Sequence, residues 1–233
     1  ADKLHSTNFG YWQVLPFNPV DKANSPYCSA SAFAGNILFI DFGMDSFDKV
    51  IKYNLLDGIK EIYVAITHLH GDHIGGLPTF IQYCAIVLNV KVKLIKNSET
   101  FKKDLTKFLE LTAVEDAFYE YVELNELNFS YLIELKETTH TPLLECYSVV
   151  FNKEGKKTLY TGDSNDVEFL KEVINDESYE DVYTEISDYP MVHMDYKEII
   201  KLDKTKITLM HIECEELYNR VKDLGYKIAK PLD

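Results

Sequence analysis

The chain has 233 residues, a formal net charge of −14, and 46% hydrophobic and 13% aromatic residues. That is enough apolar material for one α/β domain with a sizeable core, so we expect a single domain over residues 1–233. A polyanionic surface repels long nucleic acid, which excludes a polynucleotide as the expected partner. Because no apolar run approaches ~18 residues, no membrane partner is expected either.

The four cysteines, Cys28, Cys84, Cys146 and Cys214, show no CxxC spacing. The first residues also lack the charged-then-apolar pattern of a signal peptide. Both observations favour a reduced, cytoplasmic protein.

The predicted elements alternate between strands and helices along the chain. Three prolines make the first 35 residues irregular or edge structure, with an opening strand at residues 11 to 15. Strands are expected near residues 36 to 42, 61 to 67, 91 to 95, 129 to 135, 146 to 151, 158 to 161, 181 to 186 and 206 to 210. Helices are expected at 46 to 56, from Leu77 and Pro78 onward, and at 100 to 111, 167 to 174 and 214 to 224. Residues 152 to 155 predict a hairpin turn, because Gly155 supplies a left-handed residue. This pattern fits two sheets packed face to face with helices outside.

Residues 67 to 76 hold the densest group of ligand-type side chains. His68, His70, Asp72 and His73 lie within six residues, directly after an apolar strand-like run. Imidazoles and carboxylates bind borderline divalent ions such as zinc, and crowding them without a cation is costly. The glycines of this segment permit the close backbone approach that convergence requires. The segment therefore predicts a metal-binding loop.

Three further candidate ligands follow strand-like runs downstream. They are His140, Asp163 and His211. A lone histidine after a strand is ordinarily a surface or core residue, but here the pattern recurs at four separate strand ends. Such edges are where α/β sheets place binding chemistry, so the sequence predicts that these residues join the loop.

The order of these motifs, over roughly residues 36 to 215, resembles the metallo-β-lactamase superfamily. The resemblance implies a four-layer αββα sandwich. It also implies two metal sites, built from His68, His70 and His140 and from Asp72, His73 and His211, with Asp163 bridging the ions. Asp41 would orient the metal loop, or alternatively cap the next helix.

Two ions held roughly 3.5 to 4 Å apart support hydrolysis by a shared, deprotonated water. Zinc is the expected metal, and manganese or iron would also suit a set of His and carboxylate ligands. The motifs alone do not choose the bond that is cleaved.

Residues 182 to 196 resemble the Glu and His pair of ribonuclease Z and related cyclic-nucleotide phosphodiesterases. By that resemblance His193, supported by Glu185, donates a proton to the leaving oxygen, and Asp72 joins them as a catalytic residue. The alternative interpretation makes His193 a surface loop residue. The chain lacks the long basic arm with which ribonuclease Z clamps transfer RNA.

We therefore expect a phosphodiesterase that acts on a small anionic nucleotide and is similar to phage anti-Pycsar enzymes. A phage-encoded enzyme of this kind would be located in the host cytoplasm. The open alternatives are a hydrolase of a thioester, lactone or lactam, a tRNA 3′-end endonuclease, and a non-catalytic nucleotide or metal binder. The resemblance also implies a homodimer. Aromatic residues that could stack on a base include Tyr119, Tyr121, Tyr189 and Tyr196. The stretch from 115 to 121 could line a pocket, cover a sheet edge or form a dimer contact.

Overall fold

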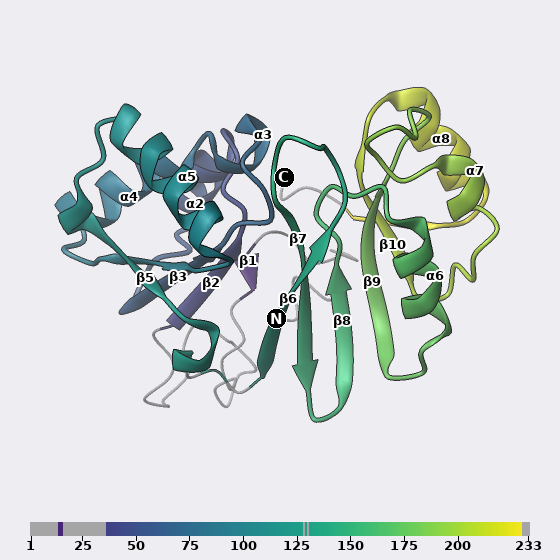
Figure 1. Ribbon diagram of the computed structural model, residues 1–233, viewed down its shortest axis with the longest axis horizontal. Coiled ribbons are helices and arrows are strands. Elements are labelled where there is room, and N and C mark those ends of the chain that lie inside the picture. Colours follow the sequence, from purple (N-terminus) through teal and green to yellow (C-terminus); the bar gives the residue numbers. More distant parts are fainter. Residues whose placement is uncertain (1–13, 16–35, 128, 130, 230–233) are drawn as a thin grey trace. The chain divides into compact units, whose positions relative to one another are not determined.

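The computed structural model describes residues 14–15, 36–127, 129 and 131–229 (Figure 1). The predictions for residues 1–13 and 16–35 lie outside these residues, including most of the opening strand. The chain divides into two compact units, one of residues 1–130 and 232 and one of residues 131–231 and 233, and each is described by itself. The single domain over residues 1–233 stays a prediction.

The first unit is built on a five-stranded sheet in the order β1-β2-β3-β4-β5, in which β2 to β5 run parallel and β1 is antiparallel to β2. Its strands are β1 (Val14–Leu15), β2 (Asn36–Ile40), β3 (Glu61–Ala65), β4 (Val92–Ile95) and β5 (Tyr119–Val122). Its helices are α2 (Ser46–Lys52), α3 (Gly71–Ile74), α4 (Leu77–Ile86) and α5 (Glu99–Leu111), with 3₁₀ turns η1 (Asp116–Phe118) and η2 (Leu124–Glu126). Helices α2, α4 and α5 lie along the sheet (Figure 1).

Helix α5 shows how sequence sets these elements. The Ser98 side chain accepts a hydrogen bond from the Phe101 amide at 3.0 Å and so caps the helix start. Phe101, Leu105 and Leu109 recur every four residues and are buried. Helix α2 is shorter than predicted, because Asn54 adopts a left-handed φ of 52°, which ends the helical path.

The second unit contains a six-stranded sheet in the order β11-β10-β9-β8-β7-β6. Its strands are β6 (Leu132–Thr138), β7 (Cys146–Lys153), β8 (Lys156–Tyr160), β9 (Tyr179–Ile186), β10 (Ile207–Ile212) and β11 (Lys227–Ile228). β6 to β8 are antiparallel, and β8 to β11 are parallel. Helices α6 (Val167–Asn175), α7 (Tyr196–Ile199) and α8 (Glu215–Asp223) pack on this sheet through a core that includes Leu170, Ile199 and Leu217. Among the described residues, no helix is long and apolar enough to cross a membrane.

Further features differ from the sequence predictions. β5 was not predicted as a strand, and it forms the edge of the first sheet. β3 ends at Ala65, two residues earlier than expected, so residues 66 and 67 already belong to the connection into the metal loop.

The predicted hairpin between β7 and β8 is confirmed. Lys153 pairs with Lys156 across a two-residue loop, in which Glu154 and Gly155 have φ values of 56° and 83°. The Asn152 side chain accepts a hydrogen bond from the Gly155 amide at 3.1 Å. Two left-handed residues in succession define the turn type that matches the twist of the strands.

We expect Gly155→Ala to lower the free energy of unfolding by about 1 kcal/mol, because a Cβ is disfavoured in the left-handed region. Glu154→Asn should raise the free energy of unfolding by a few tenths of a kcal/mol, since Asn tolerates that conformation better. Urea unfolding of both variants measures the two effects. Equal changes of the same sign would contradict this account of the turn.

Candidate metal centre

Asp41 organises the metal loop of the first unit. It follows β2 in a left-handed conformation, with φ of 56°, and it is fully buried. Its carboxylate accepts hydrogen bonds from the Thr67 amide at 2.7 Å and from the Thr67 hydroxyl at 2.8 Å, and its Oδ2 lies 2.8 Å from His73 Nδ1. The residue before helix α2 is Asp45, so Asp41 does not cap that helix.

These contacts select the ring nitrogens that could bind a metal. His73 Nδ1 donates to the Asp41 carboxylate, and His68 Nδ1 lies 3.1 Å from the Thr67 hydroxyl oxygen. In each neutral ring Nε2 then carries the lone pair. Thr67 was not singled out from the sequence, although a hydroxyl beside a histidine loop was a usable signal.

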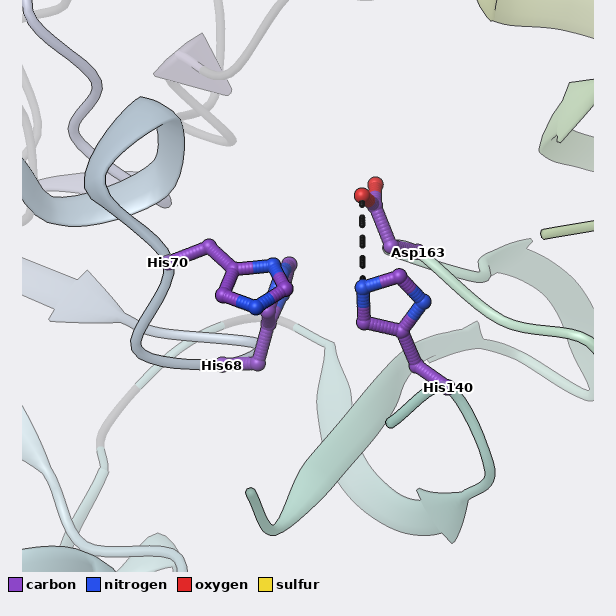
Figure 2. Close-up of side chains that lie close together, drawn as sticks. All are labelled: His68, His70, His140 and Asp163. Atoms are coloured by element: carbon purple, nitrogen blue, oxygen red, sulfur yellow. Dashed lines mark hydrogen bonds and ion pairs between the residues drawn. The ribbon is translucent and has the colours of Figure 1, made fainter. Parts of the chain in front are cut away.

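The ligand atoms of the loop have the spacing that a metal requires. His68 Nε2 lies 3.0 Å from His70 Nδ1, and Figure 2 shows the two rings turned toward one another. His73 Nε2 lies 3.6 Å from Asp72 Oδ2. Two atoms bound to one tetrahedral zinc ion are separated by about 3.4 Å, so both pairs fit a shared ion.

Glycines allow the loop to sit against the end of β2. A Cβ on Gly43 would lie 2.0 Å from the Asp72 carbonyl oxygen, and one on Gly76 would lie 2.4 Å from the Gly43 carbonyl oxygen. The Phe42 amide donates to the His73 carbonyl at 2.6 Å. Close backbone packing therefore holds this part of the site, and side chains larger than hydrogen are excluded at both glycines.

In the second unit, His140 follows β6 and is oriented by a backbone carbonyl. His140 Nδ1 donates to the Val192 carbonyl oxygen at 2.5 Å, which leaves Nε2 as the nitrogen with the lone pair. That Nε2 lies 3.9 Å from Asp163 Oδ2, the pair joined by the dashed line in Figure 2.

Asp163 faces three histidines. Its Oδ1 lies 3.2 Å from His211 Nδ1, whereas Oδ2 lies 3.9 Å from both His140 Nε2 and His193 Nδ1. Asp163 is 3% exposed and follows Gly162, whose φ of 61° turns the chain after β8.

The prediction that His211 follows the end of a strand is wrong. His211 lies inside β10, at a register shift between Leu209 and Ile212, and its φ is 46°. A bulge re-aims a side chain without ending the strand.

Glu185 and His193 form a hydrogen-bonded pair beside Asp163. His193 Nδ1 lies 2.6 Å from Glu185 Oε2, and the Ser164 amide donates to Glu185 Oε1 at 2.6 Å. The hydrogen bond to Glu185 is the main reason that the pKa of His193 is raised above its usual value, against the opposing effect of burial. Glu185 lies within β9, which extends to Ile186.

All ten predicted site residues thus lie in two groups, one in each unit. The first contains Asp41, His68, His70, Asp72 and His73, and the second contains His140, Asp163, Glu185, His193 and His211. Within the second unit, ligand atoms of His140, Asp163, Glu185 and His193 all lie within 4.8 Å of one another. The donor sets and their spacing are therefore suited to divalent metal ions.

Several solved structures share this fold. YhfI from Bacillus subtilis, a metallo-β-lactamase fold protein, is similar with a TM-score of 0.64 and 16% identity, over 84% of this chain and 85% of that chain. Zn²⁺-bound PqqB from Methylobacterium extorquens is similar with a TM-score of 0.61 and 15% identity, over 85% of this chain and 84% of that chain. The short form of human tRNase Z is similar with a TM-score of 0.56 and 15% identity, over 85% of this chain and 86% of that chain. The predicted fold class, the metallo-β-lactamase sandwich, is confirmed.

Residues 30–231 match the family described as anti-Pycsar protein Apyc1, and the chain belongs to this family.

Curated relatives give a second, partial similarity. The chain is 32% identical over 135 residues to 4-alpha-glucanotransferase of Streptococcus pneumoniae, covering 53% of this chain and 24% of that protein. It is 52% identical over 42 residues to 4-alpha-glucanotransferase of Aquifex aeolicus, a match that covers 17% of this chain and 9% of that protein. The chain thus spans a quarter or less of the length of these relatives.

Proposed function

We propose that the chain is a dinuclear-metal phosphodiesterase that hydrolyses small cyclic nucleotides. The observation that carries the proposal is Asp163, which directs one carboxylate oxygen toward His140 and the other toward His211. A carboxylate so arranged is suited to bridge two ions. Membership of the anti-Pycsar family supports the cyclic nucleotide as substrate.

The two groups of ligands would complete one centre. We propose that His68, His70 and His140 hold one ion, and that Asp72, His73 and His211 hold the other, with Asp163 shared. The donor spacings within each unit support this assignment. Bound ions, with zinc expected, would polarise the phosphoryl oxygens and lower the pKa of a water molecule.

Glu185 and His193 would complete the reaction. A water oxygen bonds to phosphorus, the P–O bond to the ribose breaks, and the departing oxygen needs a proton. Glu185 holds Nδ1 of His193 at 2.6 Å, so the other ring nitrogen, Nε2, is the one that can donate this proton. Asp163 Oδ2 lies 3.9 Å from the same Nδ1, which keeps the donor beside the shared ligand.

The proton-donor role predicts a dependence on the leaving group. We expect His193→Ala to lower kcat for a 3′,5′-cyclic mononucleotide by roughly 10² to 10⁴, the usual contribution of general acid catalysis. For bis(p-nitrophenyl) phosphate the loss should be far smaller, because p-nitrophenolate leaves without a proton. Steady-state kinetics on both substrates, with metal content measured on the same samples, tests the prediction.

Glu185→Gln is the companion variant, since it keeps the shape and weakens the hold on the imidazole. Its kcat should fall in the same substrate-dependent way, but by less. Equal losses on both substrates, or loss of bound metal from either variant, would assign the pair a structural role instead.

The whole proposal is tested by metal analysis of protein purified without added metal, followed by assays of a 3′,5′-cyclic mononucleotide and bis(p-nitrophenyl) phosphate. Two ions per chain and turnover of the cyclic nucleotide are expected. A fully loaded protein that cleaves neither substrate, but opens a thioester or lactone, would replace the phosphodiesterase with the alternative hydrolase. Stoichiometric nucleotide binding without turnover would indicate a binder.

The remaining expectations concern partners and location. We propose a small anionic nucleotide, not a polynucleotide, as the partner, because the net charge of −14 opposes binding of long nucleic acid. A homodimer and a cytoplasmic location are proposed from the family resemblance and the reduced cysteines. Light scattering of the purified protein measures its oligomeric state and so tests the proposed homodimer.

A further inference from the structure

The segment from residue 187 to residue 192 follows β9 and carries large apolar side chains into solvent. Tyr189 is 72% exposed and Met191 is 87% exposed. Leu143, on the loop between His140 and β7, is 87% exposed as well. Single exposed apolar residues are ordinary, but three of them on two loops that also carry functional residues indicate a contact surface.

The start of this segment is held by Glu213, which directly follows β10, and by Arg220 of α8. Glu213 accepts hydrogen bonds from the Ser187 hydroxyl and, at 3.3 Å, from the Asp188 amide. The Tyr189 amide donates to the Ser187 hydroxyl oxygen at 2.8 Å. Arg220 of α8 forms an ion pair with Asp188.

The end of the segment is tied to the loops that carry the proposed ligands. The Asn165 side-chain amide, two residues after Asp163, donates to the Met191 carbonyl at 2.8 Å. The Val192 carbonyl accepts the 2.5 Å hydrogen bond from His140. The backbone is therefore anchored at both ends, and the exposure of Tyr189 and Met191 does not come from a loosely held loop.

Most of the strongly exposed apolar side chains border site residues. In the first unit, Met44 is 74% exposed and lies against the metal loop, with its Cγ 2.6 Å from where a Cβ on Gly75 would be. Of the five most exposed large apolar side chains among the described residues, four are therefore close to site loops, and Leu111 at 79% is the fifth. Such a distribution favours a binding role.

We propose that Tyr189, Met191 and Leu143 contact the base of the nucleotide substrate and determine its recognition. The inference rests on the proposed function. A base offers a flat aromatic face, on which tyrosine stacks and which the methionine sulfur contacts favourably. An anchored segment makes such contacts at low entropic cost. His193 follows the segment directly, so the base would be held while the phosphate lies at the ligands.

The test compares a 3′,5′-cyclic mononucleotide with the 3′,5′-cyclic phosphate of 1-O-methylribose, which keeps the reacting ring and lacks the base. Tyr189→Ala and Met191→Ala should each lower the ratio of kcat/KM between the two substrates by about 5- to 100-fold, the range expected for one stacked base. Tyr189→Phe should keep most of the ratio, because it keeps the ring. Leu111→Ala, an equally exposed apolar residue at the end of α5, is the matched control.

Dissociation constants for the same two compounds, measured by calorimetry, separate this inference from the proposed function. If the wild type cleaves neither compound, the phosphodiesterase is wrong, and loss of nucleotide affinity in Tyr189→Ala would still support base recognition. If the wild-type ratios persist in both alanine variants, base recognition is wrong. A change from dimer to monomer with unchanged ratios would assign this surface to a second copy of the chain and overturn the inference.

Discussion

Asp163→Ala should abolish hydrolysis of a 3′,5′-cyclic mononucleotide, lowering kcat/KM by roughly a thousandfold or more. The side chain directs Oδ1 to His211 at 3.2 Å and Oδ2 to His140 at 3.9 Å, so its removal takes a ligand from both proposed ions. Metal-ion catalysis supplies several kcal/mol, and each 1.36 kcal/mol is tenfold in rate. Steady-state kinetics and metal content per chain are the measurements.

The control is Asp223→Asn, an exposed carboxylate at the end of α8, which changes the charge equally. It should leave both the kinetics and the metal content unchanged. Asp163→Asn is informative beside it, because an amide keeps the shape but is a poor bridging ligand. Two ions per chain and ordinary turnover in Asp163→Ala would refute the bridging role.

Asp41→Ala should lower the free energy of unfolding by about 3 kcal/mol or more. The carboxylate is fully buried and holds the Thr67 amide, the Thr67 hydroxyl and His73 Nδ1. Alanine leaves these donors buried without their acceptor, at about 1 to 3 kcal/mol for each unsatisfied group. It also replaces a residue that tolerates the left-handed conformation with one that tolerates it less well. Urea unfolding of the metal-free protein measures the loss.

Asn54→Ala isolates the backbone part of this effect. Asn54 has a similar left-handed φ of 52°, but its side chain is exposed. Its replacement should cost only about 1 kcal/mol. Asp41→Asn should fall between the two, since Asn tolerates the conformation and retains one acceptor. If Asp41→Ala costs no more than Asn54→Ala, the carboxylate does not hold the loop.

The residues of the candidate site were predictable because their chemistry is local in sequence. The dense loop from residue 67 to residue 76 and the ends of β6 and β8 could be found from apolar runs followed by ligand-type side chains. The hairpin at Gly155 was predictable for a similar reason, since its turn residues are adjacent. Strand and helix alternation predicted two packed sheets with helices outside, and the resemblance of the motifs supplied the four-layer metallo-β-lactamase sandwich.

Other features depend on contacts between distant residues. The hydrogen bond from His140 to the Val192 carbonyl joins positions 52 residues apart, and nothing near His140 indicates it. The bulge at His211 depends on its register against β9, which the residues of β10 do not fix alone. The edge strand β5 was missed because its short acidic and aromatic run has no clear alternation, and pairing with β4 decides its conformation.

Left-handed backbone at both Asp41 and His211, with φ of 56° and 46°, limits how this family can vary. A replacement at either position must satisfy two independent demands, the chemistry of the side chain and a backbone conformation that most residues avoid. Asparagine meets the conformational demand best, and it keeps an oxygen at Asp41 but no imidazole at His211. Few residue types should therefore be accepted at these two positions, and fewer at His211 than at Asp41.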